Sequence, residues 1–142
     1  MENRYLCCAK RIDNEQWVEG FYFCMTHPDG RHTHHFIIPL GADLSLGTPI
    51  EKIQVEVEPS TICKCTGGKD KNSKLIYEND IAKDDKGNLY KVFWQDNHYQ
   101  FSWMCVKSEK LPIGAKWNFD CFRGYEMEVI GNVFDNPELL EV

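Results

Sequence analysis

Short stretches in which apolar and polar residues alternate constrain this chain more than any other feature. The clearest stretch covers residues 50–57, and similar alternation recurs in residues 89–94, 98–103 and 125–129. Successive side chains of a strand point to opposite faces, so alternation with period two predicts strands with one buried face. Turn residues, such as those at 84–88, separate these stretches and predict hairpins. The pattern therefore predicts a mainly β protein.

The order of the stretches predicts two β-rich parts within a single domain of residues 1–142. Strands expected at 4–9, 17–23, 32–40 and 50–57 form an N-terminal hairpin lobe of about residues 1–58. A break follows at Pro59, because proline cannot donate to a β-ladder. Strands expected at 76–83, 89–94, 98–106 and 125–133 then form a meander. Loops are expected at 41–49 in the N-terminal lobe and at 111–119 in the meander. Short strands joined by tight turns favour a small antiparallel, SH3-like barrel in residues 59–142.

The C-terminus carries a helix-start signal. Asn136 is a favoured N-cap, Pro137 suits the first helical position, and Glu138 lies near the positive end of the helix dipole. With only four residues left after Glu138, the sequence predicts a helical turn and not a long helix.

Composition indicates an ordinary globular chain and excludes several function classes. Of its 142 residues, 42% are apolar and 27% are charged, enough apolar material for a core without disulfides. No apolar run approaches the roughly 20 residues of a membrane helix, and the first residues lack a signal peptide's apolar segment. We therefore expect a cytoplasmic protein with no membrane partner. A net charge of −6 argues against a nucleic-acid partner, because an acidic chain is not steered toward phosphates.

Histidines and cysteines raise the question of a metal site. His32 and His34 would share one face of a predicted strand, and this H-x-H spacing can bind zinc. The residues that could add ligands are Cys24, His27, Cys63 and Cys65. Paired Cys-x₂-Cys spacing is absent, however, and the seven cysteines resemble reduced, apolar core residues. We expect no metal and no other cofactor, and keep a metal-dependent enzyme using His32 and His34 as an alternative.

Carboxylates gather in the middle of the chain without forming a recognisable catalytic set. The residues concerned are Asp70, Glu78, Asp80, Asp84 and Asp85. Asp70, Asp84 and Asp85 fall in predicted turns, where such side chains bond nearby backbone. No nucleophile or partnered histidine accompanies them. We therefore expect no catalytic residues, and a binding protein in preference to an enzyme.

Aromatic residues are dense, with four Trp, eight Phe and six Tyr. The prominent ones in the second half are Tyr90, Trp94, Tyr99, Phe101, Trp103 and Trp117. Their strand spacing predicts barrel core, and an exposed aromatic binding face is the alternative. A small barrel cannot easily enclose all these side chains, and exposed apolar surface usually marks an interface. We therefore expect a homo-oligomer, most simply a dimer.

Two motifs resemble a known family. Residues 66–81 read TG-x-x-D-x-N-x-x-x-I-Y-E-x-D-I, and residues 128–140 read EVIGNVFDNPELL. They resemble the core motif and the closing signature of the YopX family, small proteins encoded mainly in phages and prophages. Residues 10–22 are more weakly similar to that family's opening hairpin. The sequence departs from the family pattern at Cys65, Gly68 and Ser73. The residues that carry the resemblance are Thr66, Gly67, Asp70, Asn72, Ile76, Tyr77, Glu78, Asp80, Ile81, Gly131, Asn132, Asn136 and Pro137.

The resemblance implies a fold and a genetic setting, and no particular activity. We expect the motif residues to serve structure, with Gly131 at a bulge or a close backbone approach. The function expected is that of a phage or prophage accessory protein, a non-catalytic binding or assembly module in the bacterial host cytoplasm. Its partner would be an unknown host or phage protein. The alternatives are the metal-dependent enzyme and a nucleic-acid-associated small β-barrel.

Overall fold

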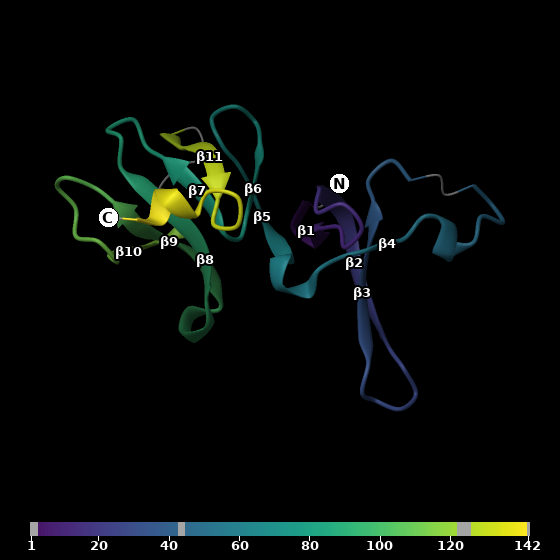
Figure 1. Cartoon of the computed structure of the whole chain (residues 1–142). Helices are drawn as coiled ribbons and strands as arrows, with labels where there is room; N and C mark the ends of the chain where they lie inside the picture. The colour runs from purple at the N-terminus through teal and green to yellow at the C-terminus, as the bar shows by residue number, and fades with distance from the viewer. Residues whose placement is uncertain (1–2, 43–44, 122–125, 142) are drawn as a thin grey trace. The chain divides into compact units, whose positions relative to one another are not determined.

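The computed structural model describes residues 3–42, 45–121 and 126–141, and it confirms the prediction of a mainly β protein (Figure 1). The chain divides into two compact units, Met1–Lys64 and Cys65–Val142. The helical elements named in the described residues are all 3-10 turns: η1 (Asn3–Tyr5), η2 (Ile50–Lys52), η3 (Pro59–Thr61), η4 (Asp96–His98), η5 (Phe119–Cys121) and η7 (Pro137–Leu140). Within the described ranges, no helix has the length and apolar character needed to cross a membrane.

The first unit is an antiparallel sheet built around one long hairpin. Its strands are β1 (Leu6–Lys10), β2 (Trp17–Thr26), β3 (Thr33–Pro39) and β4 (Val55–Glu56), in the order β4-β3-β2-β1. On the β2 side, β1 pairs with residues 17–21, and on its other side it pairs with Cys63 and Lys64 at the start of β5 (Cys63–Lys69). β4 pairs with residues 36 and 37 of β3. The far end of the β2–β3 hairpin is therefore a two-stranded ribbon, which reaches beyond its neighbours (Figure 1).

The core of this unit lies on one face of the sheet. Cys7, Ala9, Ile37 and Val57 are buried there, and the partly buried residues packed against them are Val18, Tyr22, Val55 and Ile62. Gly20 allows β2 and β3 to approach, because a Cβ at this position would collide with the backbone carbonyl of Ile38. The core residues of the strands therefore come from alternate positions, whose side chains point to the same face of the sheet.

Residues 50–57 correct one prediction. Only Val55 and Glu56 are strand, and Ile50–Lys52 forms η2 instead. Pro49 precedes the turn with φ −66°, and the amides of Ile53 and Gln54 both donate to the carbonyl of Ile50. Lys52 and Ile53 belong to this turn and not to a β-ladder, so the alternation of polar and apolar residues there does not indicate strand pairing.

The second unit contains a curled, five-stranded antiparallel sheet that forms half a barrel (Figure 1). Its order is β10-β9-β8-β7-β11. The strands are β7 (Asp80–Lys83), β8 (Leu89–Gln95), β9 (Gln100–Lys107), β10 (Lys116–Asn118) and β11 (Glu128–Asn132). β7, β8 and β9 form the predicted meander. A closed SH3-like barrel stays a prediction.

Several elements from β5 onward differ from the prediction. β5 (Cys63–Lys69) includes the Gly67-Gly68 pair that predicted a turn. The strand expected at 76–83 is split into β6 (Leu75–Tyr77) and β7 by a turn in which Asn79 has φ 71°. β10 lies in residues expected to be loop, where it pairs with β9. Tyr125, the expected start of the last strand, lies outside the described residues, and β11 begins at Glu128.

Aromatic residues fill much of the core of the second unit, as their spacing predicts. Tyr90 and Trp103 are buried together, and the other buried members of the cluster are Ile76, Ala82, Val92, Cys105 and Met127. The Trp103 ring stacks on Phe119 at 5.1 Å between centroids, and Trp117 meets Tyr90 edge-on at 5.7 Å. Trp94 and Tyr99 are exceptions, with 40% and 84% of their surface exposed.

Candidate functional site

Asp70, the central acidic residue of the first motif, fastens a turn to β11. Its carboxylate accepts hydrogen bonds from the amides of Asn72 and Lys74, both at 2.9 Å, and of Val129, also at 2.9 Å. The side chain is only 5% exposed. Burial raises the pKa of the Asp70 carboxyl. The three amide donors and the charge of Lys74 lower this pKa by more than burial raises it, so the net pKa lies below its ordinary value. This carboxylate serves structure and not proton transfer.

Other residues of the first motif hold β5 against β6. Thr66 Oγ1 donates to the carbonyl of Ile76 at 2.7 Å and accepts from the amide of Gly68 at 3.1 Å. Gly67 has φ 87°, a conformation that favours glycine. The register shifts between Cys65 and Lys69, so this is an irregular pairing held by a side chain. Ile76, Tyr77 and Ile81 are buried.

The turn between β6 and β7 contains Glu78 and Asn79, and the next residue, Asp80, has a carboxyl group with a raised pKa. Glu78 and Asp80 are both partly buried. Asp80 accepts a hydrogen bond from the amide of Tyr77 at 2.8 Å. Desolvation raises the pKa of Asp80 to about 7, and Asp70 adds to the increase by repulsion. No described nucleophile or metal-ligand cluster accompanies it, so a perturbed pKa alone does not make this turn a catalytic site.

The second motif closes a loop after β11. The register of β11 against β7 shifts between Val129 and Gly131, which is the expected bulge. The Asn132 side-chain oxygen accepts from the amides of Phe134 and Asp135 at 2.9 and 3.0 Å. Asn136 precedes η7 at the N-cap position, and Pro137 begins the turn. The Asn136 side chain makes no capping bond, contrary to expectation, because its oxygen accepts from the amide of Asn132.

His32 and His34 both lie near the tip of the β2–β3 ribbon, but the cysteines that could join them do not. Cys24 pairs with His35 in the β-register, so it lies on the opposite face of the ribbon from His34. Cys63 and Cys65 belong to β5. In the part of the chain that the structure describes, no three His, Cys, Asp or Glu side chains form a group that could hold a metal ion by themselves.

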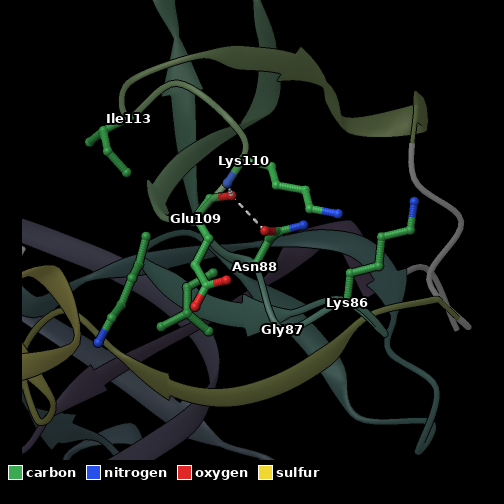
Figure 2. Close-up of a pocket in the computed structure, with 9 residues that line it drawn as sticks. Lys86, Gly87, Asn88, Glu109, Lys110 and Ile113 are labelled. Carbon is green, nitrogen blue, oxygen red and sulfur yellow. Dashed lines mark hydrogen bonds between the residues drawn. The ribbon is translucent and has the colours of Figure 1, made fainter.

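A hollow in the second unit lies between two loops of the curled sheet. Its volume is about 630 Å³. Figure 2 shows Lys86, Gly87 and Asn88 on one side, and Glu109, Lys110 and Ile113 on the other. Leu89, Lys107 and Ser108 complete the lining. Leu89 pairs with Lys107 in the β8–β9 register, and this pairing brings the two loops together.

A network of polar side chains fixes the shape of this hollow. Asp84 accepts hydrogen bonds from the amides of Lys86 and Asn88 at 3.0 and 2.9 Å, and from the Tyr90 hydroxyl at 2.9 Å. Burial raises the pKa of the Asp84 carboxyl. Its hydrogen bonds lower this pKa by more than burial raises it, so the net pKa lies below its usual value. Ser108 Oγ donates to the Asn88 side-chain oxygen at 2.6 Å, the contact dashed in Figure 2, and so joins the second loop to the first.

The charge around the hollow is positive in an otherwise acidic chain. Three lysines line it, at positions 86, 107 and 110, against one carboxylate, Glu109. Among the described residues, none of these three ammonium groups forms an ion pair. Lys86, Asn88 and Lys110 also line an adjoining hollow of about 370 Å³, whose lining includes three carboxylates, Asp84, Asp85 and Glu126. The arrangement can bind an anionic group, because unpaired ammonium groups beside fixed amides attract negative charge.

Reasoning from sequence did not identify this lysine-lined hollow. The signals available were two lysine-bearing turns, at residues 86–88 and 107–110. Each looks like an ordinary solvated turn by itself. Only the register of β8 against β9 places them on the same hollow.

The chain is similar to known proteins over almost all of its length. A family model described as YopX protein matches residues 13–141. No curated protein matches the chain. Protein EF1440 from Enterococcus faecalis, known from a crystal structure, superposes with a TM-score of 0.54 and 24% sequence identity, covering 95% of this chain and 96% of that chain. At this identity, the likeness shows a common fold alone.

Proposed function

Because the chain belongs to the YopX family, we propose that it is a phage or prophage accessory protein that acts as a non-catalytic binding module in the host cytoplasm. Its partner would be a host or phage protein, and the module would work as a homo-oligomer. The structural roles of Asp70 and Asp84 support binding over catalysis.

The lysine-lined hollow is the observation that carries this proposal. Lys86, Lys107 and Lys110 surround it without ion-pair partners among the described side chains. A basic site on a chain of net charge −6 offers a place for an anionic partner, because complementary charge steers and orients a partner. The rigid frame of Asp84, Asn88 and Ser108 holds the site open without a ligand.

An acidic segment of a protein fits the hollow best. Leu89 and Ile113 give it apolar surface beside the lysines, and Ile113 is 49% exposed. A peptide with alternating carboxylates and apolar side chains would use both features. A nucleic acid would meet the lysines too, but its sugar-phosphate backbone has no apolar side chain to place against Ile113.

Fluorescence anisotropy tests the site with a labelled peptide of alternating glutamate and leucine. We expect saturable binding that weakens as salt is added. Binding should fall at least tenfold in the triple variant Lys86→Glu, Lys107→Glu and Lys110→Glu. The matched control replaces Lys52, Lys64 and Lys69 by Glu, because these lysines are exposed, do not line the hollow and give the same change in net charge.

Equal loss of peptide binding in both triple variants would show a general charge effect and overturn the assignment to this hollow. A single-stranded DNA oligonucleotide that binds more tightly than the peptide, and depends on the same three lysines, would replace the peptide proposal by the nucleic-acid alternative. Circular dichroism of each variant establishes that the β structure is intact.

A further inference from the structure

The tip of the β2–β3 ribbon gathers three histidines on one face of the first unit. Thr26 pairs with Thr33, so the next residue along β2, His27, lies diagonally across from His34. The amide of His27 donates to the carbonyl of His32 at 2.8 Å and continues the ladder by one step. The His27 ring lies 5.2 Å from that of His34 and 6.0 Å from that of His32, centroid to centroid.

The two closest nitrogens have the spacing of metal ligands. His27 Nε2 lies 3.3 Å from His34 Nε2. A tetrahedral ion that binds each imidazole nitrogen at about 2.0–2.1 Å would separate two of its ligands by about 3.3 Å. Without an ion, one of these nitrogens must donate its proton to the other. An ion in that position would replace the shared proton without moving the rings.

The second nitrogen of His34 is already held in the way that metal sites require. His34 Nδ1 lies 2.9 Å from Oε2 of Glu56, which comes from the neighbouring strand β4. A carboxylate accepts only, so Nδ1 carries the proton and Nε2 presents its lone pair. This carboxylate–histidine pairing fixes the tautomer and orientation of metal-bound histidines. His32 Nδ1 faces Asp29 Oδ2 in a similar pairing at 3.3 Å.

We propose that His27 Nε2 and His34 Nε2 form a two-ligand site for a divalent transition ion such as Zn²⁺, with Glu56 as the residue that orients His34. Solvent supplies the remaining ligands, which agrees with the absence of a three-ligand group among the described residues. The site reverses the expectation of no metal, which rested on cysteine spacing and on His32 with His34. The pair that matters is one that only the ribbon's register brings together.

Binding would clamp the end of the ribbon. Among the described residues, the tip of the hairpin is held by cross-strand contacts such as the Thr26–Thr33 hydroxyl bond at 3.0 Å, and by the contact of His34 with Glu56 of β4. A two-stranded ribbon is marginal by itself in water. An ion bound only by the folded ribbon stabilises it in proportion to the logarithm of ion concentration.

Nuclear magnetic resonance of the imidazole nitrogens in the full chain tests the site directly, with zinc chloride as the probe and a thiol-protecting reductant present. We expect zinc to shift the Nε2 resonances of His27 and His34 and to leave those of His98, which lies in η4 of the other unit, unchanged. This readout separates the site from the exposed thiols of Cys24 and Cys121, which could also bind zinc.

Four variants extend the test to affinity. His27→Ala and His34→Ala should each abolish the resonance shift at the remaining histidine, and His98→Ala should not. Glu56→Gln should weaken zinc binding about tenfold or more, because such orienting partners carry that much affinity. All four side chains are at the surface, so folding is not at stake. Unchanged Nε2 resonances in excess zinc, or a shift that persists at His34 in His27→Ala, would overturn the proposal.

Discussion

Asp70 and Asp80 show how two carboxyl groups, ten residues apart in one motif, receive opposite pKa shifts from their surroundings. Asp70 is buried but accepts three amide hydrogen bonds, and these outweigh desolvation. Asp80 accepts one amide hydrogen bond from Tyr77, and desolvation prevails. The balance between desolvation and the hydrogen bonds that the backbone donates therefore decides the sign. Sequence predicts a turn role for Asp70, but it contains no signal for the Asp80 shift, which depends on packing around β7.

The raised pKa of Asp80 makes stability depend on pH. The folded state keeps the Asp80 proton to about pH 7, whereas an unfolded aspartate loses it near pH 4. The folded chain binds more protons in that window, so this contribution to stability is fully present below about pH 4 and declines as pH rises through about 7. Asp80→Asn keeps a neutral side chain at every pH. We expect its stability relative to the unsubstituted protein to increase between pH 4 and pH 8, by a few kcal/mol at most.

Urea denaturation at a series of pH values measures this difference. Asp85→Asn, at an exposed position in the β7–β8 hairpin, is the control and should show no such trend. Asp70 and Asp84, whose pKa values are lowered, contribute the opposite slope in every variant and cancel from the comparison. If the Asp80→Asn and unsubstituted curves run parallel across the range, the account of Asp80 is wrong.

At the scale of elements, alternation identifies strands that pair along their length and fails where the chain leaves the ladder. β7, β8 and β9 follow from their period and their turns. The alternation also includes Lys52 and Ile53, but Pro49 directs residues 50–52 into η2. β10 has only Lys116, Trp117 and Asn118, too few to show a period, and it exists because β9 offers a free edge. The lysine-lined hollow is missed for a related reason, since register is a long-range property.

The bulge at the end of β11 offers a test at this scale. Gly131 is not among the glycines with positive φ, so the reason for glycine here is space and not backbone strain. A Cβ on Gly131 would collide with the side chain of Asn136. The side-chain oxygen of Asn136 accepts a hydrogen bond from the backbone amide of Asn132 at 3.2 Å. Gly131→Val must therefore displace Asn136 and lose that hydrogen bond. We expect a destabilisation of about 1–3 kcal/mol, the usual range for overpacking.

Chemical denaturation of the full chain measures that loss. Ile130→Val is the matched control, because Ile130 occupies the bulge, is 36% exposed and differs from valine by one methylene. We expect the control to stay within about 0.5 kcal/mol of the unsubstituted protein. A Gly131→Val midpoint equal to that of the control would show that the loop after β11 accommodates a side chain freely.

For the whole molecule, the main question is what covers the apolar surface that neither unit encloses. The sequence predicts a surplus of large apolar side chains, and the first unit displays part of it on the face of the sheet opposite its core. Phe21, Phe23 and Met25 follow one another on that face of β2, across from Ile38, Phe36 and His34 of β3. Phe21 and Met25 are 41% and 52% exposed. A row of this kind typically marks an interface.

We therefore expect the protein to self-associate through this row, most simply as a dimer with two-fold symmetry, since such an interface pairs the same surface on both copies. Replacing Phe21 and Met25 together by Asp should dissociate the assembly, because it would place four carboxylates against one another in a dimer interface. Tyr99→Asp is the control, because Tyr99 is 84% exposed at the C-cap of η4 in the other unit. Light scattering after gel filtration gives the mass directly. A mass near 16.6 kDa for the unsubstituted protein across a micromolar dilution series would contradict the prediction, and a dimer lost in Tyr99→Asp but kept in the double variant would move the interface to the second unit.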